Sequence, residues 1–452
     1  MAQLIRVVRA LSKRTTVRRD GGTLTLTFQN RAKVIDAQND TVRSFWEALA
    51  GEGLTKTEAI SLLSQLPPIR RATIWAGSDS LFRNGWVDER LLCNRAPLAE
   101  RSVISAAYVP AGVTADCGLK LSRFACSRAE NDCLQVESPL CHAVVRLLSD
   151  QAAATLLRLS SGCPPGSASG NDPESSLIRF FAETGLAVPT DSTGRTIEES
   201  DPVLRQWDYH DLFFHSRSRS GRHRNPFGRI ARFSEEIEDL PPISPVGTGR
   251  ILELRKPDLN RITASEPPFG KILDARRTVR TVPDSPLTLE MVAEFLYRSA
   301  RIQQLNEATP AGSQRPFASA GGANELEIYL AACNCEDLEP GLYHYRPAEH
   351  VLECLSVSPD RLKPLLAYSG TEPVGIHVTI AARFQRLTWR YASLPYSLIL
   401  KDVGCLMQTM YLVATVMGRA PCAIGTGNSD LFARLTGRRY EVEGSVGEFV
   451  LR

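Results

Sequence analysis

The sequence lacks an apolar run as long as a membrane-spanning helix needs, and arginines interrupt the apolar residues of its first segment, MAQLIRVVRALSKRTT. We therefore expect no signal peptide and no membrane contact. The formal net charge is only +3 over 452 residues, which argues against a nucleic-acid-binding protein. The 11 cysteines are odd in number, and without a signal peptide they indicate reduced thiols in a cytoplasmic protein.

Two common nucleotide-binding patterns are also missing. The chain contains no G-x-x-x-x-G-K-[ST], and no G-x-G-x-x-G follows a predicted strand, so we expect neither a phosphate-binding P-loop nor a Rossmann site. Cys333 and Cys335 form the one close cysteine pair, but no further zinc ligand stands near them. We predict two packed thiols there and no metal site.

The first half of the chain contains one order of elements twice. RTTVRRDGGTLTLTFQ predicts a hairpin, and two helices follow in NDTVRSFWEALAG, with Asp40 as N-cap and Gly51 as stop, and in TKTEAISLLSQL. LKLSRFAC and CLQVESP then predict strands, and SDQAAATLLRLSS, capped by Asp150, and ESSLIRFFAETGL predict helices. This order predicts two winged-helix-like units, at 1–105 and 106–245, although their sequence identity is negligible.

The connection between the two halves is strongly biased in charge. FFHSRSRSGRHRNPFGRIARF is basic, and EEIEDLPPISPVGTG is acidic and then rich in proline and glycine. A nucleic-acid patch is one interpretation of the basic run. We favour a long irregular connector that the acidic stretch holds in place. The C-terminal domain is then expected at 246–452.

The second half mixes strands with long helices. TLEMVAEFLYRSARIQ predicts a helix capped by Thr288, and KDVGCLMQTMYLVATVMG predicts another that ends at Gly418. ELEIYLAACN, PVGIHVTIAARF and the pair GLYHYRP and HVLECLSV predict strands. This composition of elements predicts an α+β domain.

Three arginines and a threonine fall close together in DARRTVRTV, at 274–282. Guanidinium groups bind phosphate bidentately and a threonine hydroxyl adds a donor, so the segment is a candidate anion site; a solvated basic face is the alternative. The small residues of RPFASAGGANELEIYL and APCAIGTGNSDLFARLTG would let the backbone approach a flat ring closely, although tight turns need the same residues. Together they favour a nucleotide with a planar ring system.

In their order along the chain, these motifs resemble the SagB-type peptide dehydrogenases, the azoline-oxidising branch of the FMN-dependent nitroreductase superfamily. RRTVR is similar to that family's R-R-S-x-R, ASAGG to its P-S-A-G-A, and WRYASLPYSLILKDVG to its W-K-Y followed by a helix. GLYHY and CAIGTGNSDLFARLTG match as well, while FFHSRSRSGR and the ending VGEFVL resemble members from thiopeptide-type clusters. The resemblance covers roughly 210–452, and some members carry winged-helix peptide-clamp units upstream.

The resemblance implies a nitroreductase-like FMN domain and a homodimer with FMN at the subunit interface. It also implies oxidation of thiazolines or oxazolines to thiazoles or oxazoles in a ribosomally made precursor peptide, with oxygen reoxidising the flavin. A cyclodehydratase is a candidate further partner. The phosphate-binding residues it implies are Arg276, Arg277, Thr278, Arg280 and Arg452. The residues it implies beside the flavin ring are Ser319, Ala320, Gly321, Gly425 and Thr426.

The chain departs from the family's pattern at three positions. Arg390 stands where the family has lysine, directly before Tyr391. Because a guanidinium does not lose its proton at working pH, we expect Tyr391 to be the catalytic base and Arg390 its electrostatic partner. Cys405 replaces a histidine and Ala318 a proline. The alternatives are a diverged scaffold that binds a precursor peptide or a partner subunit, and a small-molecule nitroreductase.

Overall fold

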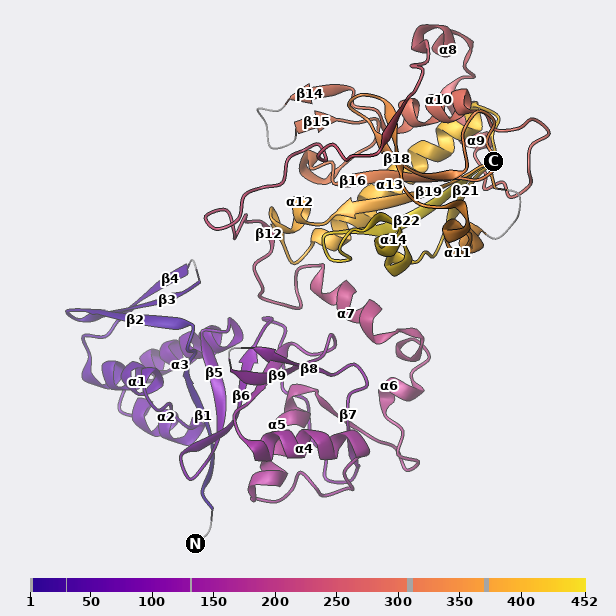
Figure 1. The fold of residues 1–452 in the computed structure, drawn as a ribbon. Coiled ribbons are helices and arrows are strands. Elements are labelled where there is room, and N and C mark those ends of the chain that lie inside the picture. Colours follow the sequence, from indigo (N-terminus) through magenta and orange to yellow (C-terminus); the bar gives the residue numbers. More distant parts are fainter. Residues whose placement is uncertain (1–2, 30, 131, 307–311, 370–373) are drawn as a thin grey trace. The chain divides into compact units, whose positions relative to one another are not determined.

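A computed structural model of the chain describes residues 3–29, 31–130, 132–306, 312–369 and 374–452. The chain divides into two compact units, Met1–Asn225 and Pro226–Arg452 (Figure 1). The division lies before the predicted boundary at 245, because most of the basic run packs within the first unit and the acidic stretch packs within the second.

The first unit is built on one antiparallel sheet with the strand order β1-β5-β6-β10-β9-β8. Its strands are β1 (Ile5–Leu11), β5 (Val87–Cys93), β6 (Ala96–Val103), β8 (Cys126–Glu130), β9 (Cys133–Glu137) and β10 (Ala143–Leu147). The β6–β10 pair joins strands from both of the segments that were predicted as separate winged-helix-like units. The prediction of two such units is therefore not confirmed.

Two apolar cores are buried in this unit. One core lies among the first three helices and a small three-stranded sheet: α1 (Asp40–Ala50), α2 (Lys56–Leu63), α3 (Pro68–Arg83), β2 (Thr15–Asp20), β3 (Thr23–Phe28) and β4 (Arg31–Asp36). The other core is formed with α4 (Asp150–Ser161) and α5 (Pro173–Thr184). Shorter elements follow: β7 (Leu119–Leu121), β11 (Ala187–Pro189), α6 (Ile197–Ser200) and α7 (Tyr209–Arg217).

The helix caps in this unit differ from the prediction by one residue. The N-cap of α1 is Asn39, not Asp40, and the N-cap of α4 is Ser149, not Asp150. Each true cap has extended backbone, which lets its side-chain oxygen accept an amide of the first turn. The predicted apolar face of α1 is confirmed, because four residues at helical spacing are buried: Val42, Phe45, Trp46 and Leu49.

The basic run and the acidic stretch bind different partners. Arg217, at the end of α7, pairs with Glu137 of β9. Asp239 of the acidic stretch instead binds the guanidinium groups of Arg386 and Arg390 in the second unit. The prediction that the acidic stretch holds the basic run is therefore wrong, because two buried arginines bind its carboxylate.

The second unit contains an antiparallel sheet with the order β13-β18-β17-β16-β19-β22-β21. Its strands are β13 (Arg250–Glu253), β16 (Leu326–Ala332), β17 (Gly341–Arg346), β18 (Val351–Leu355), β19 (Ile376–Arg383), β21 (Pro421–Ile424) and β22 (Glu443–Leu451). The core on one face includes α10 (Leu289–Ala300) and α13 (Pro395–Val416), and the core on the other includes α11 (Lys363–Leu366) and α14 (Ser429–Thr436). The predicted α+β class is confirmed for this unit.

The second unit also contains short elements, and some of them carry or flank predicted site residues. They are β12 (Gly228–Arg229), α8 (Leu259–Ser265), α9 (Phe269–Ala275), β14 (Gln304–Asn306), β15 (Gly312–Gln314), a 3-10 turn at Ala320–Gly322, α12 (Gln385–Thr388) and β20 (Tyr391–Ala392). β12 pairs with β20, which places the end of the basic run next to Tyr391 and Ala392.

α13 is the one described helix that is long and apolar enough to cross a membrane by length and composition. This differs from the expectation that no segment would qualify. Its buried side belongs to the core of the second unit, where Ile399, Leu406 and Met410 are fully enclosed. An apolar helix of this length is also what a central core helix requires.

Candidate active site

Ser319, Ala320 and Gly321 form a short loop directly before β16, which we call the small-residue loop. The Ala320 N–H donates to Oδ2 of Asp402 on α13 at 2.7 Å, and the Ser319 hydroxyl donates to Oε2 of Glu325 at 3.2 Å. Gly321 has a φ of 58°, a left-handed conformation that favours glycine. Two carboxyls therefore fix the loop.

Tyr391 reaches the same loop. A Cβ on Gly321 would collide with the Tyr391 hydroxyl oxygen, so the glycine also makes room for the phenol. The tyrosine is half-buried and packs against the main core of the unit. The fold thus brings the predicted base together with part of the predicted ring-contacting segment, while a purely packed tyrosine is the structural alternative.

Arg390 is almost fully buried and its guanidinium faces a carboxylate. Its Nε and Nη2 donate to Oδ2 of Asp239 at 3.2 and 2.7 Å, and Nη1 of Arg386 donates to Oδ1 at 3.3 Å. The Trp389 indole N–H donates to the Ile237 carbonyl at 2.5 Å and further ties the acidic stretch to this segment. Sequence reasoning missed Asp239, because nothing local signals a partner so far along the chain.

Glu325 and Asp402 are further residues that the sequence did not single out. Burial, and then repulsion by Asp402, raises the pKa of Glu325 to about 8. Burial also raises the pKa of Asp402. The only sequence signal was an acidic residue between a small-residue loop and a buried strand, in GGANELEIYL.

The predicted phosphate-binding segment follows α9 and is held by α13 and β21. The Thr278 and Tyr411 hydroxyls are hydrogen-bonded at 2.8 Å, and the Arg276 guanidinium lies 5.4 Å from the centroid of the Tyr411 ring. The Val279 N–H donates to the Pro421 carbonyl at 2.9 Å. The arginines therefore project from a fixed turn.

The other predicted residues of the site lie after α9, after β21 and after β22. Arg277 and Arg280 are exposed, whereas Arg452 is 2% exposed and its backbone exchanges two hydrogen bonds of 3.2 Å with Ala420. The two predicted residues of the second loop follow β21 and are exposed: Gly425 and Thr426.

The two parts of the predicted site contact different halves of α13. The small-residue loop contacts Asp402, while the arginine segment contacts Tyr411, roughly 14 Å further along the helix axis. This separation suits an elongated ligand with an anionic end and a flat end.

The remaining groups to consider are possible metal ligands and the cysteines of the second unit. In the described part of the chain, no group of three or more histidine, cysteine or acidic residues could hold a metal ion. The thiols of Cys333 and Cys335 donate to the carbonyls of Ala331 and Glu336, each at 3.6 Å, and Cys405 is exposed on α13.

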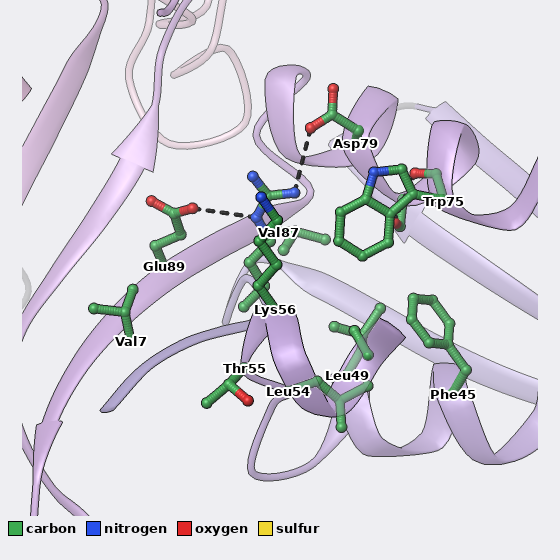
Figure 2. A pocket seen from close by; sticks show the side chains of 13 residues that line it. Val7, Phe45, Leu49, Leu54, Thr55, Lys56, Trp75, Asp79, Val87 and Glu89 are labelled. Atoms are coloured by element: carbon green, nitrogen blue, oxygen red, sulfur yellow. Dashed lines mark hydrogen bonds and ion pairs between the residues drawn. The ribbon is translucent and has the colours of Figure 1, made fainter. Parts of the chain in front are cut away.

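The first unit contains a separate cavity of about 350 Å³ (Figure 2). Its apolar lining includes Phe45, Leu49 and Trp75, and Figure 2 shows Lys56, Asp79 and Glu89 around the same space. The Arg9 guanidinium donates to Glu89 at 3.1 Å and to Asp79 at 3.3 Å. An apolar floor with a charged margin suits the side chains of an amphipathic polypeptide.

Two family models match separate parts of the chain. Residues 273–447 match the nitroreductase family, and residues 119–224 match the cyanobactin oxidase ThcOx. The second unit has a nitroreductase fold. Together the two matches indicate an oxidoreductase. The match in the first unit was missed by sequence reasoning, which had compared this region by the order of its elements alone.

Individual proteins resemble parts of this chain at low sequence identity. MJ1384 of Methanocaldococcus jannaschii, a nitroreductase by name, is 26% identical over 182 residues, which are 39% of this chain and 85% of that protein. The trifolitoxin-processing protein TfxB of Rhizobium leguminosarum bv. trifolii is 26% identical over 142 residues, 29% of this chain and 38% of that protein. A chain of the E. coli microcin synthetase McbBCD complex with truncated pro-MccB17 bound aligns at a TM-score of 0.34 and 16% identity, over 58% of this chain and 98% of that one.

Proposed function

We propose that the protein is an FMN-dependent dehydrogenase that oxidises thiazoline or oxazoline rings to thiazoles or oxazoles in a ribosomally made precursor peptide, with oxygen as the final acceptor. The observation that carries the proposal is the contact of the Tyr391 hydroxyl with Gly321 within a nitroreductase fold. The match to an oxidase in the first unit and the likeness to a toxin-processing protein support a peptide substrate.

The residues present fit FMN. Arg276, Arg277 and Arg280 can surround a phosphate from their fixed turn, with the Thr278 hydroxyl beside them. The small-residue loop leaves the backbone open to a flat ring. When bound, FMN supplies the hydride acceptor that azoline oxidation needs.

The protein's own residues would then position the substrate and move one proton. The Tyr391 oxygen would act as the phenolate, take the ring proton next to the carbonyl of the azoline and become the neutral phenol. Gly321 leaves the phenol room to approach, and Asp402 holds the Ala320 amide in place. Arg390 holds the segment of Tyr391 through its ion pair with Asp239 and contributes positive charge beside it.

A homodimer would cover an exposed apolar strip on α13. Tyr396 is 47% exposed and Leu400 is 39% exposed, one helical turn apart, and Gly404 follows at the same spacing. A second copy packed on this strip would place FMN at a subunit interface, as the resemblance implies. A cyclodehydratase is proposed as a further partner.

The Arg390–Asp239 ion pair also favours a second candidate, a diverged scaffold that binds a precursor peptide or a partner subunit. The pair gives Arg390 a structural role that does not require catalysis. Colour separates the two functions: a purified yellow protein with a flavin absorbance band supports the dehydrogenase, whereas a colourless protein that FMN cannot restore supports the scaffold.

We expect the double variant Arg276→Ala/Arg280→Ala to purify largely without flavin. Each lost charge-assisted hydrogen bond is worth roughly 1.5–3 kcal/mol. The flavin-to-protein absorbance ratio measures the loss. The matched control is Arg261→Ala/Arg361→Ala, which removes two exposed arginines of the same unit and should keep the flavin. Full flavin occupancy in the first double variant would show that the phosphate is bound elsewhere.

We also propose that the cavity of the first unit binds the precursor peptide. Trp75 lines it, and aromatic anchors of this kind contribute about 2 kcal/mol or more to binding, a factor of roughly 30. Trp75→Ala in the full chain should weaken binding of a fluorescently labelled precursor peptide, measured by fluorescence anisotropy. Trp207→Ala, a half-buried tryptophan outside the cavity, is the control. Equal affinities of the two variants would argue against the cavity.

A further inference from the structure

Glu325 and Asp402 are buried carboxyls that hold the small-residue loop at two neighbouring points. Glu325 is fully enclosed and Asp402 is 5% exposed. Asp402 Oδ2 accepts the Ala320 N–H at 2.7 Å, and Glu325 Oε2 accepts the Ser319 hydroxyl at 3.2 Å. The two carboxyls also lie within hydrogen-bonding reach of each other.

The second oxygen of Glu325 has no donor. Among the residues that the structure describes, no N–H or O–H donates to Oε1, and solvent does not reach this atom. A buried charged acceptor without a donor is strongly unfavourable. Asp402, the neighbouring group, can supply a donor only if one of the two carboxyls carries a proton.

We propose that Glu325 and Asp402 share one proton and act as a positioning pair that holds the small-residue loop against Tyr391. With the proton present, the pair has one negative charge and an internal hydrogen bond. Without it, two buried negative charges repel each other, and the contacts to Ser319 and Ala320 are pulled apart. Only the catalytic consequence rests on the proposed function, because proton sharing itself does not require any substrate.

The charged groups around the pair do not replace the proton. Arg386 of α12 faces Glu325, but its guanidinium already binds Asp239 and the Ala323 carbonyl. Lys401 lies next to Asp402 on α13 and is exposed. The Tyr391 hydroxyl reaches Gly321 from β20 and brings no positive charge to the pair.

The direction of the pH dependence follows from the raised pKa of Glu325, about 8 against an ordinary 4.5. The folded chain therefore holds this proton more tightly than the unfolded chain does. The stabilising contribution is fully present below about pH 4.5 and is lost as the pH rises through about 8. Stability of the second unit should decrease over this range.

The test uses the full chain and the variant Glu325→Gln, whose amide keeps the shape and supplies a permanent N–H donor. The infrared difference spectrum between the wild type and the variant at pH 7 should show the C=O band of a buried protonated carboxyl. The difference is needed because burial also raises the pKa of Asp88 in the first unit. The melting temperature of the wild type should fall by several degrees more than that of the variant between pH 5 and pH 9. Glu339→Gln, at an exposed glutamate, is the control and should behave as the wild type does.

The pH dependence of the oxidation rate distinguishes a positioning role from a merely structural one. The wild type should lose its oxidation rate above about pH 8, whereas Glu325→Gln should retain it. If the variant fails to fold, Asp402→Asn and the infrared band of the wild type still decide the question. A wild type without the carboxyl band, or with the same pH dependence of melting as Glu325→Gln, overturns the proposal. Absence of azoline oxidation together with a normal band would instead contradict the proposed function.

Discussion

We expect Asp239→Ala to destabilise the second unit by about 3–5 kcal/mol, because removing one partner of a buried ion pair leaves its other charge uncompensated. Here two guanidinium groups depend on the same carboxylate: Arg386 is 1% exposed and Arg390 is 3% exposed. Burial and the neighbouring Arg390 already lower the pKa of Arg386 to about 10, and loss of Asp239 would lower it further. Thermal unfolding at pH 7 should show a decrease of the melting temperature by roughly 6–20 °C.

The matched control for this experiment is Asp360→Ala. Asp360 forms an ion pair with Lys363 at 2.7 Å, but both side chains are exposed. Exposed pairs contribute only about 0–1 kcal/mol, so the control should melt within a few degrees of the wild type. Similar melting temperatures for Asp239→Ala and Asp360→Ala would mean that water compensates the charges of the two arginines. The ion pairs of Asp239 would then not stabilise the unit.

Local sequence patterns predicted those helices and strands that are determined by residues a few positions apart. The helix spacing around Phe45 and the strand alternation around Leu24 repeat at intervals of a few residues, and both segments form as predicted. The N-cap at Thr288 was also predicted, because its hydroxyl needs only an amide three residues away. Where two acceptable caps stand side by side, as at Asn39 and Asp40, backbone conformation decides between them.

Contacts between distant segments could not be predicted in the same way. The β6–β10 pair joins the two segments of the first unit into one sheet, and its register depends on residues about forty positions apart. Asp239 binds arginines that stand about 150 positions later. Glu325 could not be predicted as a site residue from the sequence, because the carboxyl that raises its pKa, that of Asp402, lies on a different element. Residue type alone does not reveal that a carboxyl will be buried beside another one.

The proposed catalytic pair comes from the resemblance, and the structure adds a partner to one of its two residues. Tyr391 and Arg390 are adjacent in sequence, yet their side chains contact different groups: Gly321 and Asp239. The guanidinium that was expected to act on the phenol therefore shares its charge with a carboxylate. This makes the phenol itself the group whose removal should have the largest effect on the reaction.

We expect Tyr391→Phe to reduce the rate of azoline oxidation by roughly 10²–10⁴, because the change removes the hydroxyl and with it the general base. The ring stays in the core, so the fold and the flavin content should be unchanged.

Arg390→Lys restores the residue of the family's pattern and should leave activity intact or increase it. Each rate is measured by mass spectrometry of an azoline-containing peptide under single-turnover conditions.

The control for the hydroxyl is Tyr440→Phe, which makes the same chemical change at a tyrosine that is 58% exposed and has no part in the proposed site. It should oxidise the peptide at the wild-type rate. Tyr391→Phe with bound flavin and a wild-type rate would make Tyr391 a packing residue and leave the base to be found elsewhere. A loss of rate that is accompanied by loss of flavin would be uninformative about proton transfer, so the absorbance ratio must be compared before the rates are. With flavin retained and the rate reduced only in Tyr391→Phe, the proton passes through the hydroxyl that lies against Gly321.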